Sequence, residues 1–100
     1  MSNGFEAHIA GNARLAILEA LYDQPDRSLP EMVLQKALER VGIKRSRDYV
    51  RTQLRWLKDM GAVYLLDRTQ VWTATMMQTG IDHVERRSVI EGVERPQPEA

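Results

Sequence analysis

The stretch from Ser46 to Met60 constrains the fold of this chain most, because it predicts a helix with two chemically different faces. Ser46 is a suitable N-cap, Asp48 suits the positive end of the helix dipole, and Gly61 predicts where the helix stops. With the stretch wound at about 100° per residue, one arc holds the side chains expected to face a core: Tyr49, Val50, Gln53, Leu54, Trp56, Leu57 and Met60. A separate arc of about 80° holds the cations Arg47, Arg51, Arg55 and Lys58. We therefore expect this helix to pack with one face and to present positive charge with another.

Two more helices are expected before this stretch. The first covers about Asn12 to Gln24, with Asn12 as its N-cap and Pro25 as its stop. Apolar residues continue its buried stripe backwards to Phe5, so an earlier start near Gly4 stays open. A glycine in the middle of that extension would cost about 1 kcal/mol relative to alanine.

The second helix is expected from about Leu29 to Val41. Ser28 and Glu31 have the spacing of a capping box, in which each side chain accepts a hydrogen bond from a backbone N–H of the first turn. The intervening proline falls in that first turn, where its missing N–H costs nothing. Gly42 follows as the expected C-terminal stop.

After Gly61 the pattern changes from helical to extended. Ala62–Leu66 (AVYLL) and Val71–Thr75 (VWTAT) are rich in β-branched and aromatic residues, and the polar stretch Asp67–Gln70 separates them. This pattern predicts a β-hairpin with Arg68 at or near its tip.

The rest of the chain is less sharply patterned. A fourth helix is expected over roughly Gln78–Arg87, where Thr75 and Gln78 again have capping-box spacing. Ser88–Val93 is ambiguous between helix and strand. The tail Glu94–Ala100 holds two prolines and no apolar residue before its final alanine, so we expect one domain over residues 1–93 and a disordered end.

Several classes of protein are disfavoured by what the 100 residues contain. The absence of cysteine removes disulfides and thiolate metal sites, and the pair Asp82 and His83 is too small a group to predict a metal ion. No apolar run approaches the ~18 residues of a membrane span, and the first residues do not resemble a secretory signal. No nucleophile, acid pair or glycine-rich phosphate loop stands out. We therefore expect a cytoplasmic protein that is not an enzyme and has no cofactor.

The net charge of zero conceals a strongly basic segment. Lys44–Lys58 holds six basic residues and one acidic residue, a net charge of +5 within fifteen residues. A concentrated basic stripe is what nucleic-acid binding requires, whatever the charge of the whole chain. A charged helix face is often only a solvated surface, but here the four cations of the arc share one sign without an acid among them on that arc, and like charges at this spacing disfavour a helix slightly.

The order of these elements predicts a mainly α fold with a β-hairpin, namely a winged helix-turn-helix: a three-helix core, a two-stranded wing and a C-terminal helix. Its third helix would enter the major groove of duplex DNA, and the wing with Arg68 could touch the flanking backbone. Trp56 and Tyr49 are expected in the core or an interface rather than stacked on bases, and Trp72 in the core or at a dimer surface.

The stretch SRDYVRTQLRWLKDMGAV (Ser46–Val63) resembles the recognition-helix signature of ArsR/MarR-like winged-helix repressors. The matching positions are Ser46, Val50, Leu54, Leu57, Gly61 and Val63. This resemblance implies base- or phosphate-facing roles for Arg47, Arg51, Thr52 and Arg55. ArsR-type metal sensors carry cysteines before that helix and this chain has none, so metal sensing is not expected. Over nearly its full length the chain also resembles small winged-helix proteins of Mu-like bacteriophages, which implies a bacterial or phage-infected host cell.

The sequence thus favours a DNA-binding transcriptional regulator. The residues expected to contact DNA are Lys44, Arg45, Ser46, Arg47, Arg51, Thr52, Arg55, Lys58 and Arg68. A homodimer is expected from the relatives' use of terminal helices, with Phe5, Ile9, Ile81 and Val84 at its interface. Two alternatives remain open: an adaptor whose arginines pair with acidic residues of another protein, and an accessory protein that associates with DNA without sequence preference.

Overall fold

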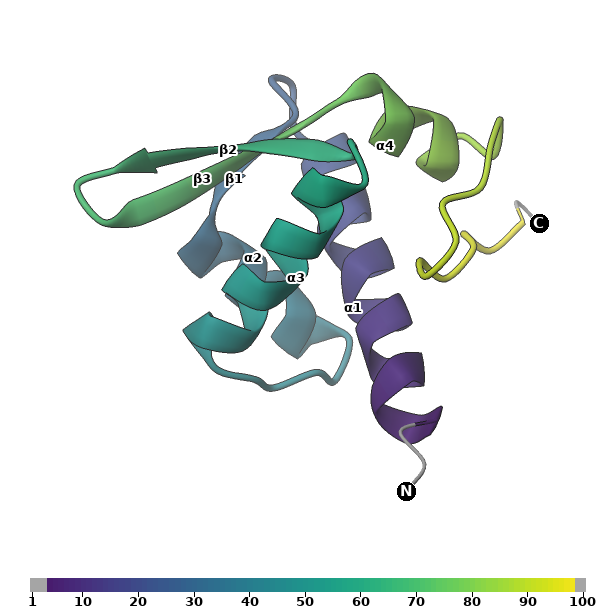
Figure 1. Ribbon diagram of the computed structural model, residues 1–100, viewed down its shortest axis with the longest axis horizontal. Helices are drawn as coiled ribbons and strands as arrows, with labels where there is room; N and C mark the ends of the chain where they lie inside the picture. The colour runs from purple at the N-terminus through teal and green to yellow at the C-terminus, as the bar shows by residue number, and fades with distance from the viewer. Residues whose placement is uncertain (1–3, 99–100) are drawn as a thin grey trace.

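Helix α1 (Gly4–Tyr22) runs lengthwise through the molecule in the computed structural model, which describes residues 4–98, and the C-terminal segment lies to its right in Figure 1. It starts at the earlier of the two expected positions, so Asn12 is not a cap. Asn12 lies in the middle of the helix, and its side-chain amide donates to the His8 carbonyl at 2.9 Å. The C-terminal segment crosses α1 at Gly11, where the Glu94 N–H donates to the Gly11 carbonyl at 3.1 Å. The inner face of α1 supplies much of the core: Ala13, Ile17, Leu18 and Leu21.

The expected capping box at Ser28 and Glu31 is wrong. Residues Ser28–Pro30 form a short strand, β1, and helix α2 (Glu31–Arg40) begins directly after it. The Ser28 hydroxyl lies 2.8 Å from the Thr75 hydroxyl of a neighbouring strand instead of capping a helix. Glu31 is the first residue of α2, and its side chain turns into the interior. The helix ends as expected before Gly42, which has φ +86°.

Helix α3 (Arg47–Asp59) confirms the two-faced helix expected from the sequence. The Ser46 hydroxyl accepts the Tyr49 N–H at 3.1 Å, and Gly61 (φ +77°) follows the helix end. Four side chains of the expected core face are buried: Val50, Gln53, Leu54 and Leu57. The outer part of the expected arc is less buried, since Met60 is exposed and Tyr49 and Trp56 are half-buried.

Strands β2 (Val63–Arg68) and β3 (Val71–Met76) form the expected hairpin around a two-residue turn. Strand β1 pairs with β3 on its other side, so the antiparallel sheet has the order β1-β3-β2 and three strands rather than the expected two. The inner face of the sheet buries Val63, Ala74 and Met76 against the helices. In Figure 1 the hairpin turn extends away from the body at the end opposite helix α4.

Helix α4 (Gln78–Val84) is shorter than expected, because Glu85 ends it and Arg86 has φ +66°. The expected capping box at Thr75 and Gln78 is wrong, since Thr75 lies in β3 and the N-cap residue, Met77, makes no side-chain cap. Residues 88–93 form neither helix nor strand, yet two of their side chains are buried: Ile90 and Val93.

The residue directly after the expected domain end at residue 93 is also held to the helices. Glu94 is tied to α1 through its N–H and to α4 through its carbonyl, which lies 2.9 Å from the His83 Nε2. Within residues 4–98 the molecule is therefore a mixed α/β domain of four helices and one three-stranded sheet. None of those helices is both long enough and apolar enough to cross a membrane.

Candidate functional site

The outer surface of α3 carries three exposed cations on its flank nearest the hairpin: Arg47, Arg55 and Lys58. Lys44, in the turn before the helix, is also exposed. Within the described part of the chain, none of these four side chains forms an ion pair, and Arg55 lies over the ring of Trp72 with its guanidinium carbon 5.1 Å from the ring centre. Their charge is therefore presented to solvent.

Arg51, expected among these outward cations, is instead engaged inside the molecule. Its Nε donates to one oxygen of the Glu31 carboxylate at 2.6 Å, and its Nη2 donates to the other at 2.7 Å. The Arg51 guanidinium also lies over the Trp72 ring, 4.3 Å from the ring centre. The side chain is only 20% exposed, and that of Glu31 is 0% exposed. Two parallel charge-assisted hydrogen bonds of this kind are among the stronger polar contacts in proteins.

The same ion pair contacts the hairpin at two backbone groups. The Trp72 N–H donates to the Glu31 carboxylate at 2.9 Å, and the Arg51 Nη2 donates to the Gln70 carbonyl at 2.8 Å. The Arg51 hydrogen bonds hold the pKa of Glu31 below its ordinary value, helped by the Trp72 N–H, although burial acts in the opposite direction. The Glu31 carboxylate raises the pKa of Arg51 in turn. Both groups are therefore charged near neutral pH.

This arrangement bears on the DNA contact expected of Arg51, because its guanidinium is paired inside the molecule. A guanidinium that already spans a buried carboxylate and a backbone carbonyl would have to leave Glu31 as an unpaired buried charge in order to bind a base or a phosphate. Helical periodicity placed Arg51 on the cationic arc correctly, but the arc lies beside the hairpin, and Glu31 occupies the space between them.

Three further predicted site residues have structural partners. Arg45 pairs with Glu6 of α1 at 3.1 Å and lies over the Tyr49 ring at 4.9 Å. The Ser46 hydroxyl is used as the N-cap of α3. Thr52 is exposed, and its hydroxyl donates to the Asp48 carbonyl of its own helix at 3.0 Å. Of these three, the exposed Thr52 is the one best placed to meet a ligand.

Arg68 ends β2 beside the hairpin turn and is exposed. It pairs in register with Val71, so the two side chains share one face of the sheet, whereas Asp67 and Trp72 share the other. Trp72 lies on the face that meets α3. The structure therefore brings Arg68 next to the turn, as expected, but on the outer face of the hairpin.

The expected dimer residues do not form one patch. Phe5 is 72% exposed near the free end of α1. Ile81 and Val84 belong to α4, which lies at the other end of α1, where the Tyr22 hydroxyl donates to Glu85 at 2.6 Å. Ile81, Val84 and Ile9 are each packed in part against the core of their own chain.

The rear of α3 is tied to α1 and to the C-terminal segment through Arg14. Its guanidinium stacks on Trp56 at 3.8 Å, donates to Gln53 at 2.8 Å and donates to the Gly92 carbonyl at 2.9 Å. Burial lowers the pKa of Arg14. Trp56 is thus a packing residue, as expected, and nothing in the sequence pattern pointed to Arg14.

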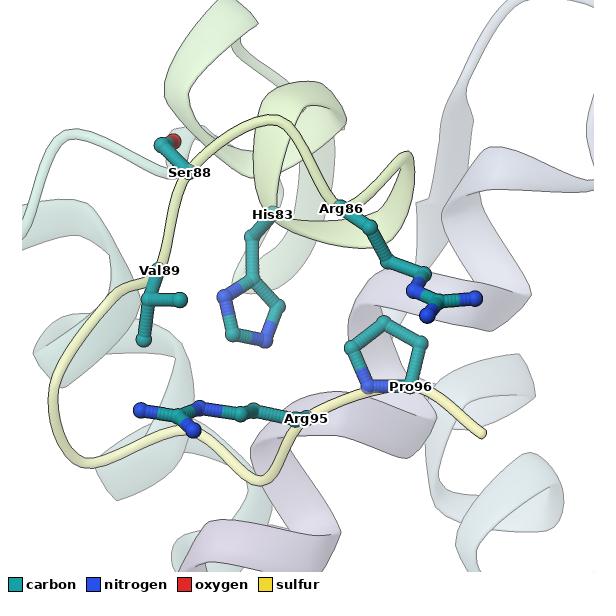
Figure 2. Close-up of a pocket in the computed structure, with 6 residues that line it drawn as sticks. All are labelled: His83, Arg86, Ser88, Val89, Arg95 and Pro96. Carbon is teal, nitrogen blue, oxygen red and sulfur yellow. The ribbon is translucent and has the colours of Figure 1, made fainter. Parts of the chain in front are cut away.

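A cavity of about 330 Å³ lies between the end of α4 and the C-terminal segment (Figure 2). His83 lines it, but its Nδ1 accepts the Ile90 N–H at 3.0 Å and its Nε2 donates to the Glu94 carbonyl, so both ring nitrogens are used. In Figure 2 the side chains of Arg86 and Arg95 extend in opposite directions and do not converge on one point. Among residues 4–98 there is also no cluster of metal-ligating side chains. The cavity therefore offers weaker chemistry than α3.

Comparison with known proteins finds one informative relative. A protein of Escherichia phage Mu, described as uncharacterized protein gp26, is 36% identical over 87 residues. The match covers 87% of this chain and 90% of the Mu protein. No protein-family model matches the chain, and no solved structure matches it.

Proposed function

The chain belongs to the family of the phage Mu protein gp26, and we propose that it is a winged-helix protein that binds duplex DNA through α3. The order helix, strand, two helices and hairpin supports the winged-helix assignment. In that fold the third helix enters the major groove, which at about 12 Å wide admits one helix.

One observation carries the proposal: the exposed cations Arg47, Arg55 and Lys58 lie along one flank of α3, and none of them forms an ion pair within the described chain. Surface cations usually have mixed neighbours, and unpaired cations in a row repel one another. Phosphates of a duplex would relieve that repulsion. Lys44 extends the positive region before the N-terminus of α3, and Arg68 adds a further exposed cation on the outer face of the neighbouring hairpin.

The test is a titration of the protein with random duplex DNA at several salt concentrations. Four phosphate contacts per protomer would give a slope of log affinity against log salt of about −3.6. K58A should reduce that slope by about one unit. R87Q is the matched control, because Arg87 is an exposed arginine of the distant α4 region that pairs with Asp82 and Glu85. Absence of binding at about 50 mM salt, where phosphate contacts are weakly screened, would refute the proposal.

Regulation requires sequence preference, which we assign to the N-terminal half of α3. In helix-turn-helix complexes this end inserts deepest, which makes Arg47 the foremost base reader and Lys58 a phosphate contact. Accordingly, R47A should cost about 1–3 kcal/mol on a preferred site selected from a random pool, and much less on random duplex. Equal losses on both would indicate an accessory protein that binds DNA without sequence preference.

One specific surface favours a protein-binding adaptor, although it is apolar and is not the set of arginines expected to pair with acidic residues of a partner. Tyr64, Leu66 and Val71 lie on the outer face of the sheet and are all exposed. Contiguous exposed apolar side chains are typical of protein–protein contacts. If an L66S variant binds duplex DNA with the affinity of the wild type, this surface is not part of the DNA-binding site.

We further propose that the protein acts as a homodimer, for which the exposed Phe5 at the free end of α1 is the foremost contact. Two copies related by a twofold axis could present their third helices to successive major grooves about 34 Å apart. Sedimentation at micromolar protein should give a dimer mass for the wild type and a lower mass for F5S. A monomer mass at all concentrations would refute the dimer.

A further inference from the structure

The hairpin turn is held to the rest of the molecule by few contacts. Residues Leu66–Val71 around the turn are all exposed. The turn residues Thr69 and Gln70 both have positive φ, at 48° and 68°, which neither side chain favours. A hairpin end of this kind is free to swing unless something fixes it. Within the described residues, the backbone groups of Gln70 and Trp72 are anchored by the Glu31–Arg51 pair.

The geometry of the Glu31 carboxylate makes this anchor specific. Three donors converge on its two oxygens: Arg51 Nε, Arg51 Nη2 and the Trp72 N–H. All three groups are donors, so the centre must be an acceptor with two equivalent oxygens, and a carboxylate is the side chain that provides them. The pair therefore joins the start of α2, the middle of α3 and the hairpin at one point.

We infer that Glu31 and Arg51 are positioning residues that clamp the hairpin turn against α3, so that Arg68 and the cations of α3 meet one duplex together. The inference rests on the proposed DNA binding. Neither of these two residues contacts the duplex itself. Arg51 acts through the hairpin, because its own charge is paired with that of Glu31. Loss of the clamp would leave α3 intact but would let the hairpin, and Arg68 with it, move independently.

R51K is the most informative variant. Lysine keeps the positive charge but cannot span two carboxylate oxygens and the Gln70 carbonyl at once. We expect hydrogen exchange at the Trp72 amide to accelerate at least tenfold, while the buried amides of α3 keep their protection. Duplex affinity should fall by about tenfold, as when a pre-organised binding element becomes mobile. If Arg51 makes no phosphate contact, the slope of log affinity against log salt should stay within about half a unit of the wild-type slope.

A double-mutant cycle separates positioning from mere stabilisation. R68A should weaken duplex binding severalfold in the wild type and have almost no effect in R51K, because the hairpin is then no longer placed against the duplex. If the clamp contributes only stability, the effect of R68A will be the same in both backgrounds. Either that additivity or a lack of effect of R68A in the wild type would overturn the inference.

E31M/R51M covers the case in which a single variant fails to fold. It removes both charges, so no buried charge is left unpaired, and apolar replacement of a buried pair is often tolerated. It should reproduce the loose hairpin and the lost R68A effect. If instead the Trp72 amide of E31M/R51M exchanges its hydrogen as slowly as that of the wild type, the Glu31–Arg51 pair does not hold the hairpin. If the wild type binds no duplex, the proposed function is wrong, and the exchange data still decide whether this pair holds the hairpin.

Discussion

Gly92 is the residue at which the C-terminal segment passes closest to α3. Its φ of +96° is a conformation that residues with a side chain rarely adopt. A Cβ at this position would lie 2.6 Å from the Trp56 Cζ2 and 2.7 Å from its Cη2, closer than carbon atoms can approach. The close approach lets Arg14 stack on Trp56 and donate to the Gly92 carbonyl at once.

G92A should therefore be more destabilising than the same change at a glycine with only the backbone constraint. Gly42 is the matched control, since its φ is +86° and no atom lies within 4 Å of the place that a Cβ would take. We expect G42A to cost about 1–2 kcal/mol from backbone strain and G92A a further 1–3 kcal/mol from the clash. Urea denaturation of both variants measures the difference. Equal losses would mean that Trp56 moves aside freely.

Glu31 should make the free energy of unfolding depend on pH. Its pKa is lowered in the folded state, first by the Arg51 hydrogen bonds, so folding favours the ionised form. The resulting stabilisation is fully present above the ordinary carboxyl pKa of about 4.5 and is lost as the pH falls from there through the lower folded value. Denaturation at a series of pH values from neutral down to about 3 should show a steep loss for the wild type and a shallower one for E31M/R51M. E39Q, which changes an exposed glutamate of the same helix, should keep the wild-type profile.

Local sequence signals identified the helical arc of Arg51 but not its partner. The periodicity of α3 depends only on neighbouring residues, so the arc of cations was correctly predicted. The partner Glu31 lies 20 residues earlier, and its spacing from Ser28 imitates a capping box. Only the folded chain brings Glu31 beneath the hairpin, where it forms an ion pair with Arg51 that the local pattern does not show.

At the scale of elements, the hairpin is the least favourable piece of local backbone. Its two-residue turn has positive φ at both positions, the geometry that asparagine followed by glycine adopts most readily. Here the positions hold Thr69, which is β-branched, and Gln70. The Thr69 hydroxyl compensates in part by donating to the Arg68 carbonyl at 2.6 Å.

T69N/Q70G should stabilise the protein by about 1 kcal/mol, because it relieves the strain at both turn positions. The Gln70 carbonyl that Arg51 uses belongs to the backbone and is retained. T69A is the control, since it removes the hydroxyl without relieving the positive φ, and it should not stabilise. Thermal unfolding measures both. A decrease in melting temperature for T69N/Q70G would show that the side chains of the turn make contacts that outweigh the strain.

The elements themselves differ in how far the sequence predicts them, and the range of their contacts is the reason. Helix α3 and the hairpin carry caps, periodicity and a turn within their own residues, so their bounds were predicted nearly as observed. Strand β1 has three residues, one of them proline, and exists because it pairs with Thr73–Thr75 of β3, far along the chain. No pattern within Ser28–Pro30 could reveal that partner.

At the scale of the whole molecule, the C-terminal segment completes the core instead of trailing from it. Ile90 and Val93 are buried, and the two nitrogens of His83 bond to Ile90 and Glu94. The Glu94 N–H reaches back to Gly11, which joins residues near the two ends of the described chain. The sequence showed a polar, proline-containing tail after Val93, but it could not show that the segment before the tail folds back along α1.

Two truncations test where the folded domain ends. A chain that stops after Glu94 keeps both buried side chains and both His83 hydrogen bonds, so its stability should match the full chain within about 0.5 kcal/mol. A chain that stops after Ser88 exposes the surface that Ile90 and Val93 cover, at about 1.5–3 kcal/mol for each side chain, and leaves the buried His83 ring without partners. That sum is comparable to the whole stability of a small domain, so the shorter chain should be largely unfolded by circular dichroism. V93A, which removes one of the two contacts in the full chain, should lower stability by an intermediate amount. A cooperative unfolding transition for the Ser88 truncation, equal to that of the full chain, would show that helices α1–α4 and the sheet form a complete core without the C-terminal segment.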